Sequence, residues 1–254
     1  MGRSGGPEGT GFFAGAVGVS GLVGAWERQA RRVAEVCAAR LPVLIGVYAH
    51  GSAALGGFTR ASDLDVLVIG MQAADWPALG RELLSTAIDF PLELSVVAPP
   101  DAARPAAPWP FLLHVASPDR IVRPHLGGGD PDLCAHYAVT RQAGIPILGP
   151  PAEEVFGQVS RGMMLTYLRG ELVWGVEHAD QRYAILNACR AAAYATDQVI
   201  LSKIDGGRWW ARRYGHDRLV QQALAAQAAG YDLGPCTPDA AQFIQRAART
   251  VTHL

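Results

Sequence analysis

Two aspartates, Asp63 and Asp65, begin the apolar stretch DLDVLVI, which ends at residue 69. Side chains alternate across a strand, so these two carboxylates point to the same face. At a rise of roughly 3.3 Å per residue they lie about 7 Å apart along the chain. Carboxylates this close repel each other unless a cation lies between them, and such hard oxygen ligands suit Mg²⁺, which takes phosphate oxygens as further ligands. The spacing therefore predicts a magnesium site for a phosphate-bearing substrate.

A third acid and a small turn accompany the pair. Glu93 interrupts the apolar run PLELSVV, where a carboxylate is costly, and it converges on the aspartates if the two strands are neighbours. Upstream, Gly51 permits close backbone approach, and Ser52 offers a hydroxyl and an N–H group to phosphate. Together these residues predict a site that clamps a nucleoside triphosphate through a metal ion. Taken singly, each has a structural alternative: Asp63 could cap a turn, and Glu93 could pair with an arginine.

A helix-like stretch in the second half carries one polar stripe and is followed by Lys203, the single lysine of the chain. At about 100° per residue the stripe falls within an arc of about 80°, and its members are Asp180, Tyr183, Asn187, Arg190 and Tyr194. Solvated faces favour Lys, Glu and Gln, so these residue types indicate a face that lines a cleft; a solvated face is the alternative. On an unbroken helix Lys203 would point away from the stripe. The helix must therefore end before Lys203 if the lysine shares the site.

The hydrophobic pattern locates the elements that must position these residues. Apolar runs predict strands at residues 43–50, 63–70 and 91–98, and helical spacing predicts helices at 25–40 and 76–88. Strands that alternate with helices indicate an α/β unit.

Three further segments complete the first half of the chain. The Pro-rich residues 99–110 predict a loop, and residues 111–116 predict an edge strand. Residues 130–144 predict a helix that Asp130 caps and Gly144 ends.

From about residue 151 almost every segment has helical spacing. The predicted organisation is a disordered Gly-rich extension at 1–24, an α/β (α+β) domain with a mixed sheet at 25–150, and an all-α helical bundle at 151–254.

The net charge is −1 and no basic block occurs, which argues against nucleic-acid binding. No segment resembles a membrane span, and the four cysteines lack CxxC spacing, so a cytoplasmic monomer with reduced thiols is expected.

The stretch HGSAALGGFTRASDLDVLV matches the pattern G-S-x(10)-D-x-D and resembles the nucleotidyltransferase superfamily with the polymerase-β-like fold. The helical half narrows the resemblance. Residues 183–213, the stretch GPPAEEVF and the stretch DPDLCAHYAVTRQAGIPILG are similar to aminoglycoside adenylyltransferases of the streptomycin 3''/spectinomycin 9 type. The resemblance extends from about residue 43 to 213 and continues more loosely to the end of the chain.

This resemblance implies a role for each matching position. It makes Asp63 and Asp65 the Mg²⁺ ligands and Glu93 the catalytic base. The residues that it places near ATP are Gly51, Ser52, Ser62, Arg190, Lys203 and, with a one-residue shift, Tyr231. The resemblance places Asp180 near the acceptor. Trp174 and Tyr183, which stand near acceptor positions of the family, and Asn187 of the polar stripe are expected to line the same site.

Some positions depart from the family pattern. Val176 stands near the position of a family aspartate, Tyr183 replaces a histidine of some members, and a tryptophan is missing near Ser117 and Pro118. These departures favour spectinomycin or another aminocyclitol over streptomycin.

The expected reaction is Mg²⁺-dependent transfer of AMP from ATP to a hydroxyl of an aminoglycoside or aminocyclitol antibiotic. A cationic acceptor fits a cleft whose acids are Asp180, Glu93 and either Glu171 or Glu177. Two alternatives stay open at this point. The chain could modify a protein or another small molecule by the same chemistry, or it could bind nucleotide as a regulatory module without turnover.

Overall fold

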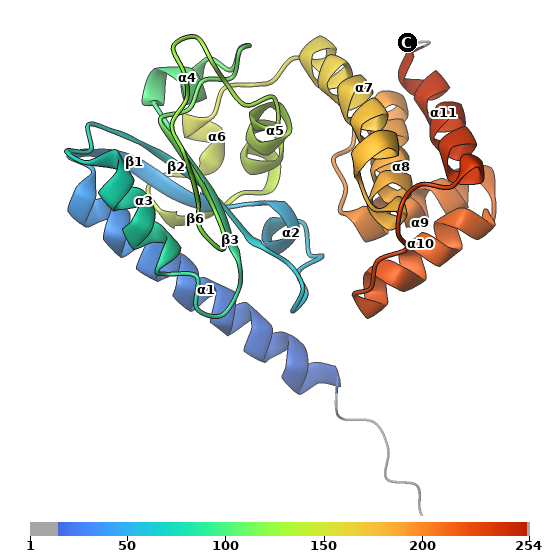
Figure 1. Ribbon diagram of the computed structural model, residues 1–254, viewed down its shortest axis with the longest axis horizontal. Coiled ribbons are helices and arrows are strands. Elements are labelled where there is room, and N and C mark those ends of the chain that lie inside the picture. The colour runs from blue at the N-terminus through green and yellow to red at the C-terminus, as the bar shows by residue number, and fades with distance from the viewer. Residues whose placement is uncertain (1–14, 253–254) are drawn as a thin grey trace, which may run out of the picture.

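The computed structural model describes the backbone of residues 15–252. In this range a six-stranded mixed sheet with helices on both faces is followed by a bundle of helices that lies to one side of it (Figure 1). The expected fold class is therefore confirmed. No helix in the described part of the chain is both long and apolar enough to cross a bilayer.

The sheet has the strand order β5-β4-β3-β2-β1-β6. Only β2 and β3 run parallel, and every other neighbouring pair is antiparallel. The strands are β1 Val43–Ala49, β2 Leu64–Met71, β3 Leu92–Val97, β4 Leu113–Ala116, β5 Arg120–Val122 and β6 Ile145–Leu148. The helices of this half are α1 Gly15–Arg40, α2 Gly51–Ala54, α3 Trp76–Leu84, α4 Pro99–Ala103, α5 Leu133–Ala143 and α6 Ala152–Val155.

Alternation along β2 assigns its side chains to two different apolar clusters. Leu64, Val66 and Val68 pack with α1 and α3 on one face of the sheet. Leu67 and Ile69 point to the other face, which α4, α5 and α6 cover (Figure 1). Because successive side chains change face, Asp65 lies on the second face, toward the helical half.

The helical half consists of α7 Arg161–His178, α8 Gln181–Asp197, α9 Lys203–Tyr214, α10 Arg218–Ala229 and α11 Pro238–Thr252. Polar residues cap four of these helices by accepting backbone N–H groups, and they are Ser160, Asp180, Ser202 and Asp217. Helix α8 is central, since α7, α9, α10 and α11 all pack against it (Figure 1). Its buried face is rich in alanine, so the neighbouring helices approach closely.

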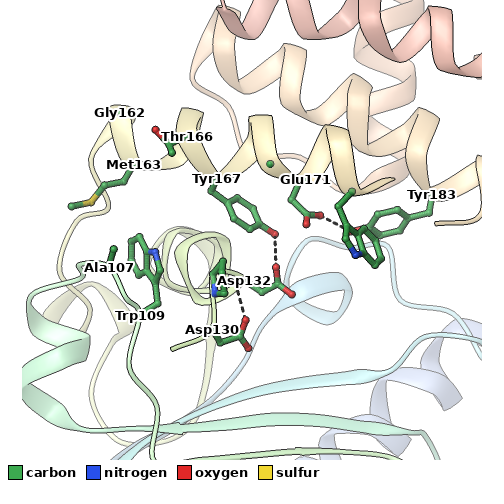
Figure 2. A pocket seen from close by; sticks show the side chains of 13 residues that line it. Ala107, Trp109, Asp130, Asp132, Gly162, Met163, Thr166, Tyr167, Glu171 and Tyr183 are labelled. Atoms are coloured by element: carbon green, nitrogen blue, oxygen red, sulfur yellow. Dashed lines mark hydrogen bonds between the residues drawn. The ribbon is translucent and has the colours of Figure 1, made fainter. Parts of the chain in front are cut away.

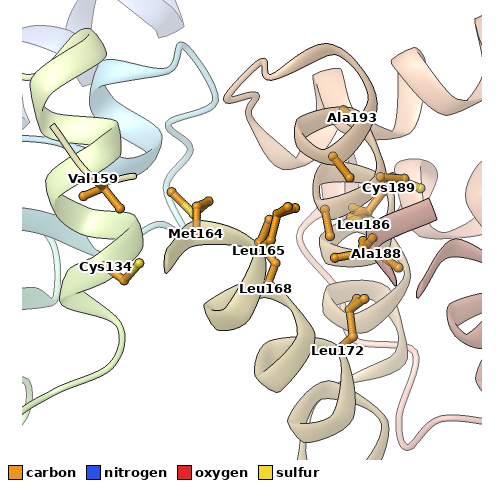
Figure 3. Packing of buried hydrophobic residues seen from close by; sticks show 14 of the residues in the cluster. Cys134, Val159, Met164, Leu165, Leu168, Leu172, Leu186, Ala188, Cys189 and Ala193 are labelled. Atoms are coloured by element: carbon orange, nitrogen blue, oxygen red, sulfur yellow. The ribbon is translucent and has the colours of Figure 1, made fainter. Parts of the chain in front are cut away.

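One apolar cluster joins the two halves. Met164 and Leu165, in the first turns of α7, lie between Cys134 of α5 and the buried face of α8 (Figure 3). Helix α6, which falls after the predicted boundary at residue 150, packs against α4 and α5 of the first half. This shared core fixes α7 relative to the sheet.

The edges of the sheet differ from the expectation. The strand predicted at 111–116 as an edge is β4, which pairs on both sides, and the true edges are β5 and β6. These two strands have three and four residues, and β6 contains Pro146, so neither carries a readable alternation. The predicted loop at 99–110 contains one further short helix, α4.

The predicted disordered extension was wrong for residues 15–24, which belong to α1. Once the helix at 25–40 has formed, adding residues costs less than starting a helix, so glycines in the preceding turns are tolerated. Residues 1–14 of that extension lie outside the described part of the chain.

Candidate active site

The three predicted carboxylates meet at the paired ends of β2 and β3. Asp63 immediately precedes β2, Asp65 is the second residue of that strand, and Glu93 lies opposite Asp65 in the parallel register. In parallel neighbours, residues in register point to the same face. The predicted convergence of Asp65 and Glu93 on one face is therefore confirmed, on the face toward the helical half.

Asp65 is held in a position that favours a cation beside it. The pKa of Asp65 is raised to about 7, mainly by burial and also by charge repulsion from Glu93 and Asp63, while His136 and Lys203 oppose the rise. Gly51, which has a positive φ, lies so close that a β carbon there would collide with the Asp65 carboxylate. The glycine thus lets the turn after β1 close against this acid.

These acids fit a Mg²⁺ ion that shares its coordination with a nucleotide. In the described residues, no group of three or more His, Cys, Asp or Glu side chains could hold a metal ion by itself. Mg²⁺ is commonly bound by one or two carboxylates together with phosphate oxygens and water. Asp63 and Asp65 are the residues that would hold it, and the repulsion that raises the pKa of Asp65 is what such an ion would relieve.

A pair of histidines next to Asp65 was missed by the sequence analysis. The backbone N–H of His50 donates to the Asp65 carbonyl oxygen at 3.0 Å, and its ring centroid lies 4.8 Å from that of His136 on α5. Burial and the nearby His136 lower the pKa of His50 well below its ordinary value, so His50 is neutral at pH 7. His50 directly precedes the recognised turn, but nothing in the sequence places His136 beside it.

Two cations from the helical half face these acids. Lys203 is the first residue of α9, and burial followed by repulsion from Arg190 lowers its pKa to about 8. Asp65 and Asp63 act in the opposite direction on that pKa, which shows that they lie near the ammonium group. Neither Lys203 nor Arg190 forms an ion pair with any described side chain. A lysine at the N-terminus of α9 with an arginine of α8 near it, neither in an ion pair with a described side chain, is an arrangement that suits an anion such as a triphosphate.

The helix end that the shared site requires is present. Helix α8 ends at Asp197, Gln198 adopts a left-handed conformation, and α9 starts at Lys203. The change of direction returns Lys203 to the side of Tyr183, whose ring centroid lies 5.0 Å from the lysine Nζ. This part of the prediction is confirmed.

The remaining residues predicted near ATP lie along the contact between the two halves. A β carbon on Gly57 would lie 3.4 Å from that of Ser202, and one on Gly230 would lie 3.9 Å from that of Ala61. Ser62 follows Ala61, and its hydroxyl accepts the Thr59 N–H at 3.0 Å. Tyr231 follows Gly230 and is half exposed, and Ser52 lies in α2. Their contacts with ATP stay predictions.

A cavity of about 750 Å³ lies between α7 and the segment that precedes α5 (Figure 2). Aromatic rings and three carboxylates share its walls, which comprise Ala107, Trp109, Asp130, Pro131, Asp132, Gly162, Met163, Thr166, Tyr167, Gly170, Glu171, Trp174 and Tyr183. The Tyr167 hydroxyl donates to Asp132 Oδ1 at 3.1 Å, so the two walls are linked directly. A site with apolar rings and a few placed acids suits an amphipathic, cationic ligand.

The N-terminus of α5 and the stretch before it differ from the prediction. Asp132, not Asp130, occupies the N-cap position of α5, yet its side chain makes no capping hydrogen bond and binds Tyr167 instead. Asp130 accepts the Asp132 N–H at 3.0 Å. Trp109 comes from the stretch 99–110, which was predicted to be a loop, and its ring forms part of the cavity wall. The wall therefore contains a tryptophan although the family tryptophan expected near Ser117 is missing.

Two family models match this chain, one in each half. A family model described as nucleotidyltransferase domain matches residues 30–99, and one described as aminoglycoside adenylyltransferase, C-terminal domain, matches residues 154–251. The chain therefore combines a nucleotidyltransferase domain with the C-terminal domain of aminoglycoside adenylyltransferases. It is therefore an enzyme of the nucleotidyltransferase class, as the sequence predicted.

Solved structures support the fold of this nucleotidyltransferase. The spectinomycin adenyltransferase AAD(9) from Enterococcus faecialis, solved with ATP and spectinomycin, is similar with a TM-score of 0.70 and 15% identity. The match covers 88% of this chain and 98% of that one. A toxin-antitoxin structure with AMP-PNP covers 59% of this chain at 17% identity, but its TM-score of 0.30 is too low to carry an argument. A comparison with curated proteins finds no relative.

The predicted acceptor residues of this nucleotidyltransferase separate into two groups. Tyr183 and Trp174 lie on the cavity wall, with ring centroids 6.2 Å apart, and their contacts with an acceptor stay predictions. Asn187 is buried behind the wall, and Asp180 lies outside the cavity. The Asp180 carboxylate accepts the N–H groups of Arg182, Leu233 and Gly234.

These backbone hydrogen bonds make Asp180 a cap of α8 in this structure. The acid that faces the cavity from the helical half is Glu171, since Glu177 also lies outside it. Glu171 Oε2 accepts hydrogen bonds from Tyr183 at 3.1 Å and from Asn187 at 3.3 Å. Of the five stripe residues on α8, Tyr183 lines the cavity, Arg190 donates to Asn187 behind the wall, and Tyr194 packs against the core.

Proposed function

We propose that this enzyme transfers AMP from ATP to a hydroxyl of an aminoglycoside or aminocyclitol antibiotic, spectinomycin before streptomycin, with Mg²⁺, and so confers resistance. The observation that carries the proposal is the arrangement around Tyr183. Its ring contacts the Lys203 ammonium group, and its hydroxyl binds Glu171 in the cavity wall. A phosphate-binding cation and an acid for a cationic acceptor thus lie on two sides of one side chain.

In this proposal the cations on the helices bind the triphosphate of ATP, and the acids on the sheet hold the metal ion. Arg190 and Lys203 bind the triphosphate, and their positive charge stabilises the pyrophosphate as it departs. Mg²⁺, held by Asp63, Asp65 and phosphate oxygens, would supply further charge neutralisation on the phosphates. Gly51 lies against Asp65 and Ser52 follows it in α2, so in this proposal the turn after β1 binds the phosphates from the first half of the chain.

Glu93 is the general base in this proposal. It takes the proton from the acceptor hydroxyl as the oxygen attacks the α-phosphorus, and the bond from the α-phosphorus to the bridging oxygen of pyrophosphate breaks. Glu93 lies on the same face as Asp65 and in register with it, so a base and a metal ligand are placed together by the strand pairing. The products are the adenylylated acceptor and pyrophosphate.

The cavity favours an acceptor that is cationic and carries apolar ring faces. Asp132 and Glu171 provide negative charge on two walls, and Trp109 and Trp174 provide flat apolar surface. Spectinomycin is a fused-ring aminocyclitol with amine and hydroxyl groups, and it is the drug bound in the similar solved structure. Streptomycin carries guanidinium groups on a longer frame and is the weaker candidate.

A pyrophosphate-release assay with purified enzyme, ATP, Mg²⁺ and a panel of antibiotics tests the proposal. The panel includes spectinomycin, streptomycin and aminoglycosides with a deoxystreptamine ring, and the Glu93→Gln variant is the control. Release that depends on an antibiotic and on Glu93 supports the proposal. ATP binding without release on any acceptor would instead favour the regulatory module, and release on protein acceptors alone would favour protein modification.

A further inference from the structure

Asn187 is the only asparagine of the chain, and it is buried in α8 with 4% of its surface exposed. Both ends of its amide are used. The Nδ2 group donates to Glu171 Oε2 at 3.3 Å, and Oδ1 accepts from the Arg190 guanidinium at 2.7 Å. An amide suits this place because it offers a donor to a carboxylate and an acceptor to a cation from one short side chain.

On the acceptor side, Asn187 orients the carboxylate of Glu171 through a hydrogen bond. Asn187 and Tyr183 both bind Oε2, and no described group donates to Oε1. Oε1 is thus left for a cation in the cavity. Burial and Asp132 raise the pKa of Glu171, whereas Tyr183, Arg190 and Asn187 act against that rise and favour the ionised form.

On the nucleotide side, Asn187 is the one side chain in the described residues that forms a hydrogen bond with Arg190. The Nε atom of Arg190 is buried without a partner. The arginine stem packs against Gly206 of α9, where a β carbon would lie 2.7 Å from the Arg190 Cγ. The stem is therefore confined by packing, and Asn187 sets the orientation of the guanidinium group.

We propose that Asn187 is a positioning residue that serves both substrates, orienting Arg190 for the triphosphate and Glu171 for a cationic group of the acceptor. It contacts neither substrate itself. The nucleotide half of this inference needs only an ATP site at Arg190, and the acceptor half rests on the function proposed above.

Calorimetry of ATP–Mg²⁺ binding to four proteins tests the nucleotide half without any antibiotic. They are the wild type, Asn187→Leu, Arg190→Met and the double variant. Loss of a hydrogen bond to a charged group changes an equilibrium by about 10- to 100-fold, and an indirect effect is expected at the lower end, about tenfold. Asn187→Leu should weaken ATP about tenfold when Arg190 is present and less than about twofold when it is Met. Equal effects in both backgrounds, or none in either, would overturn the inference.

Gln181→Leu is the matched control for a purely structural role. Gln181 is another buried amide on α8, but it accepts from Thr237 at 3.0 and 2.9 Å and touches neither Arg190 nor Glu171. Its replacement should lower the melting temperature and leave ATP affinity unchanged. If Asn187→Leu fails to fold, Asn187→Ala makes the same cycle with a smaller change in shape.

A second cycle tests the acceptor half, with spectinomycin and streptomycin as probes. Asn187→Leu should weaken drug binding about tenfold in the wild-type background, where Glu171 is present, and less than about twofold in the Glu171→Gln background. An equal loss in both backgrounds overturns the acceptor half. If neither drug binds the wild type, the proposed acceptor class is wrong, while the ATP cycle still decides the role of Asn187 toward Arg190.

Discussion

The nucleotide side and the acceptor cavity are built in different ways. On the nucleotide side, the acids lie on two paired strands, and the register of β2 and β3 fixes Asp65 opposite Glu93. In the cavity, the acids come from the N-terminus of α5 and from α7, and a hydrogen bond between Tyr167 and Asp132 joins the two walls. The first arrangement depends on local strand geometry and the second on how two halves of the chain pack. Substitutions on the two sides should therefore separate catalysis from acceptor choice.

Asp65→Asn should produce the largest effect, a loss of turnover of at least about 10³-fold. The substitution removes the charge that would hold Mg²⁺, whose stabilisation of developing charge amounts to several kcal/mol. The melting temperature should stay near that of the wild type, because Asn keeps the shape next to Gly51. Pyrophosphate release measures the effect, with Asp119→Asn in an exposed turn as the matched control. Activity within a few-fold of wild type would remove Asp65 from the metal site.

Glu93→Gln should reduce turnover by about 10²–10⁴-fold while ATP–Mg²⁺ still binds with near-normal affinity. Gln keeps the shape of the side chain but cannot take the proton, and Asp63 and Asp65 remain to hold the metal. Calorimetry of ATP–Mg²⁺ alongside pyrophosphate release distinguishes the roles. Loss of metal-dependent ATP binding would instead make Glu93 a third metal ligand, and full activity would make it structural.

Lys203 should make ATP binding sensitive to alkaline pH. Its pKa of about 8 in the free enzyme means that it is mostly charged at pH 7 and mostly neutral at pH 9. Bound phosphate favours the charged form, so the Kd for ATP should rise about tenfold between these pH values. Lys203→Arg keeps its charge and should flatten this rise, and Lys203→Ala should weaken ATP by about 10- to 100-fold at pH 7. An identical pH profile for wild type and Lys203→Arg would contradict the assignment.

Glu171→Gln should weaken acceptor binding by about 5- to 20-fold, since it removes a charge that faces a cationic ligand. ATP affinity should change far less. Glu177→Gln is the matched control, because Glu177 is on the same helix but lies outside the cavity. Titration of the drug by calorimetry measures both variants. Equal losses for the two would show that the cavity is not the acceptor site.

Asp180→Ala should have the smallest effect on acceptor affinity, less than about threefold, and should instead destabilise the protein. Asp180 caps α8 and accepts the Leu233 and Gly234 N–H groups, each at 2.7 Å. Loss of such a cap costs about 1–3 kcal/mol of unfolding free energy. Thermal unfolding and drug titration are read together. A large loss of drug affinity at an unchanged melting temperature would restore Asp180 as an acceptor residue.

Much of the nucleotide side could be predicted from the sequence because its determinants are short-range. Alternation along a strand predicted Asp63 and Asp65 on a common face, with Glu93 joining them if its strand lay beside theirs, as it does. The need for a helix end before Lys203 followed from helix periodicity alone. The short edge strands β5 and β6 could not be predicted, since three or four residues with a proline show no period. Their absence from the prediction did not disturb the central strands that carry the acids.

The acceptor side shows where sequence reasoning stopped. Asp180 was predicted to be a cleft acid because it begins the polar stripe of α8. The N-terminus of a helix also needs a capping group, and the structure shows that the Asp180 carboxylate accepts the Arg182 N–H there. Asp132 looked like part of a helix start, yet Tyr167 from the other half binds its carboxylate. His136 carries no sequence signal at all, because its partner His50 is brought to it by packing of α5 on the sheet.

The sequence by itself determined the family, the order of the domains and the acids of β2 and β3, because strand and helix periods act over a few residues. Only the tertiary structure decided the walls of the cavity, the lack of an ion pair at Arg190 and Lys203 within the described residues, and the link through Asn187 between Arg190 and Glu171. These features join residues that are distant along the chain. The physical reason is that their contacts depend on how α7 and α8 are held against the sheet by one shared apolar core (Figure 3).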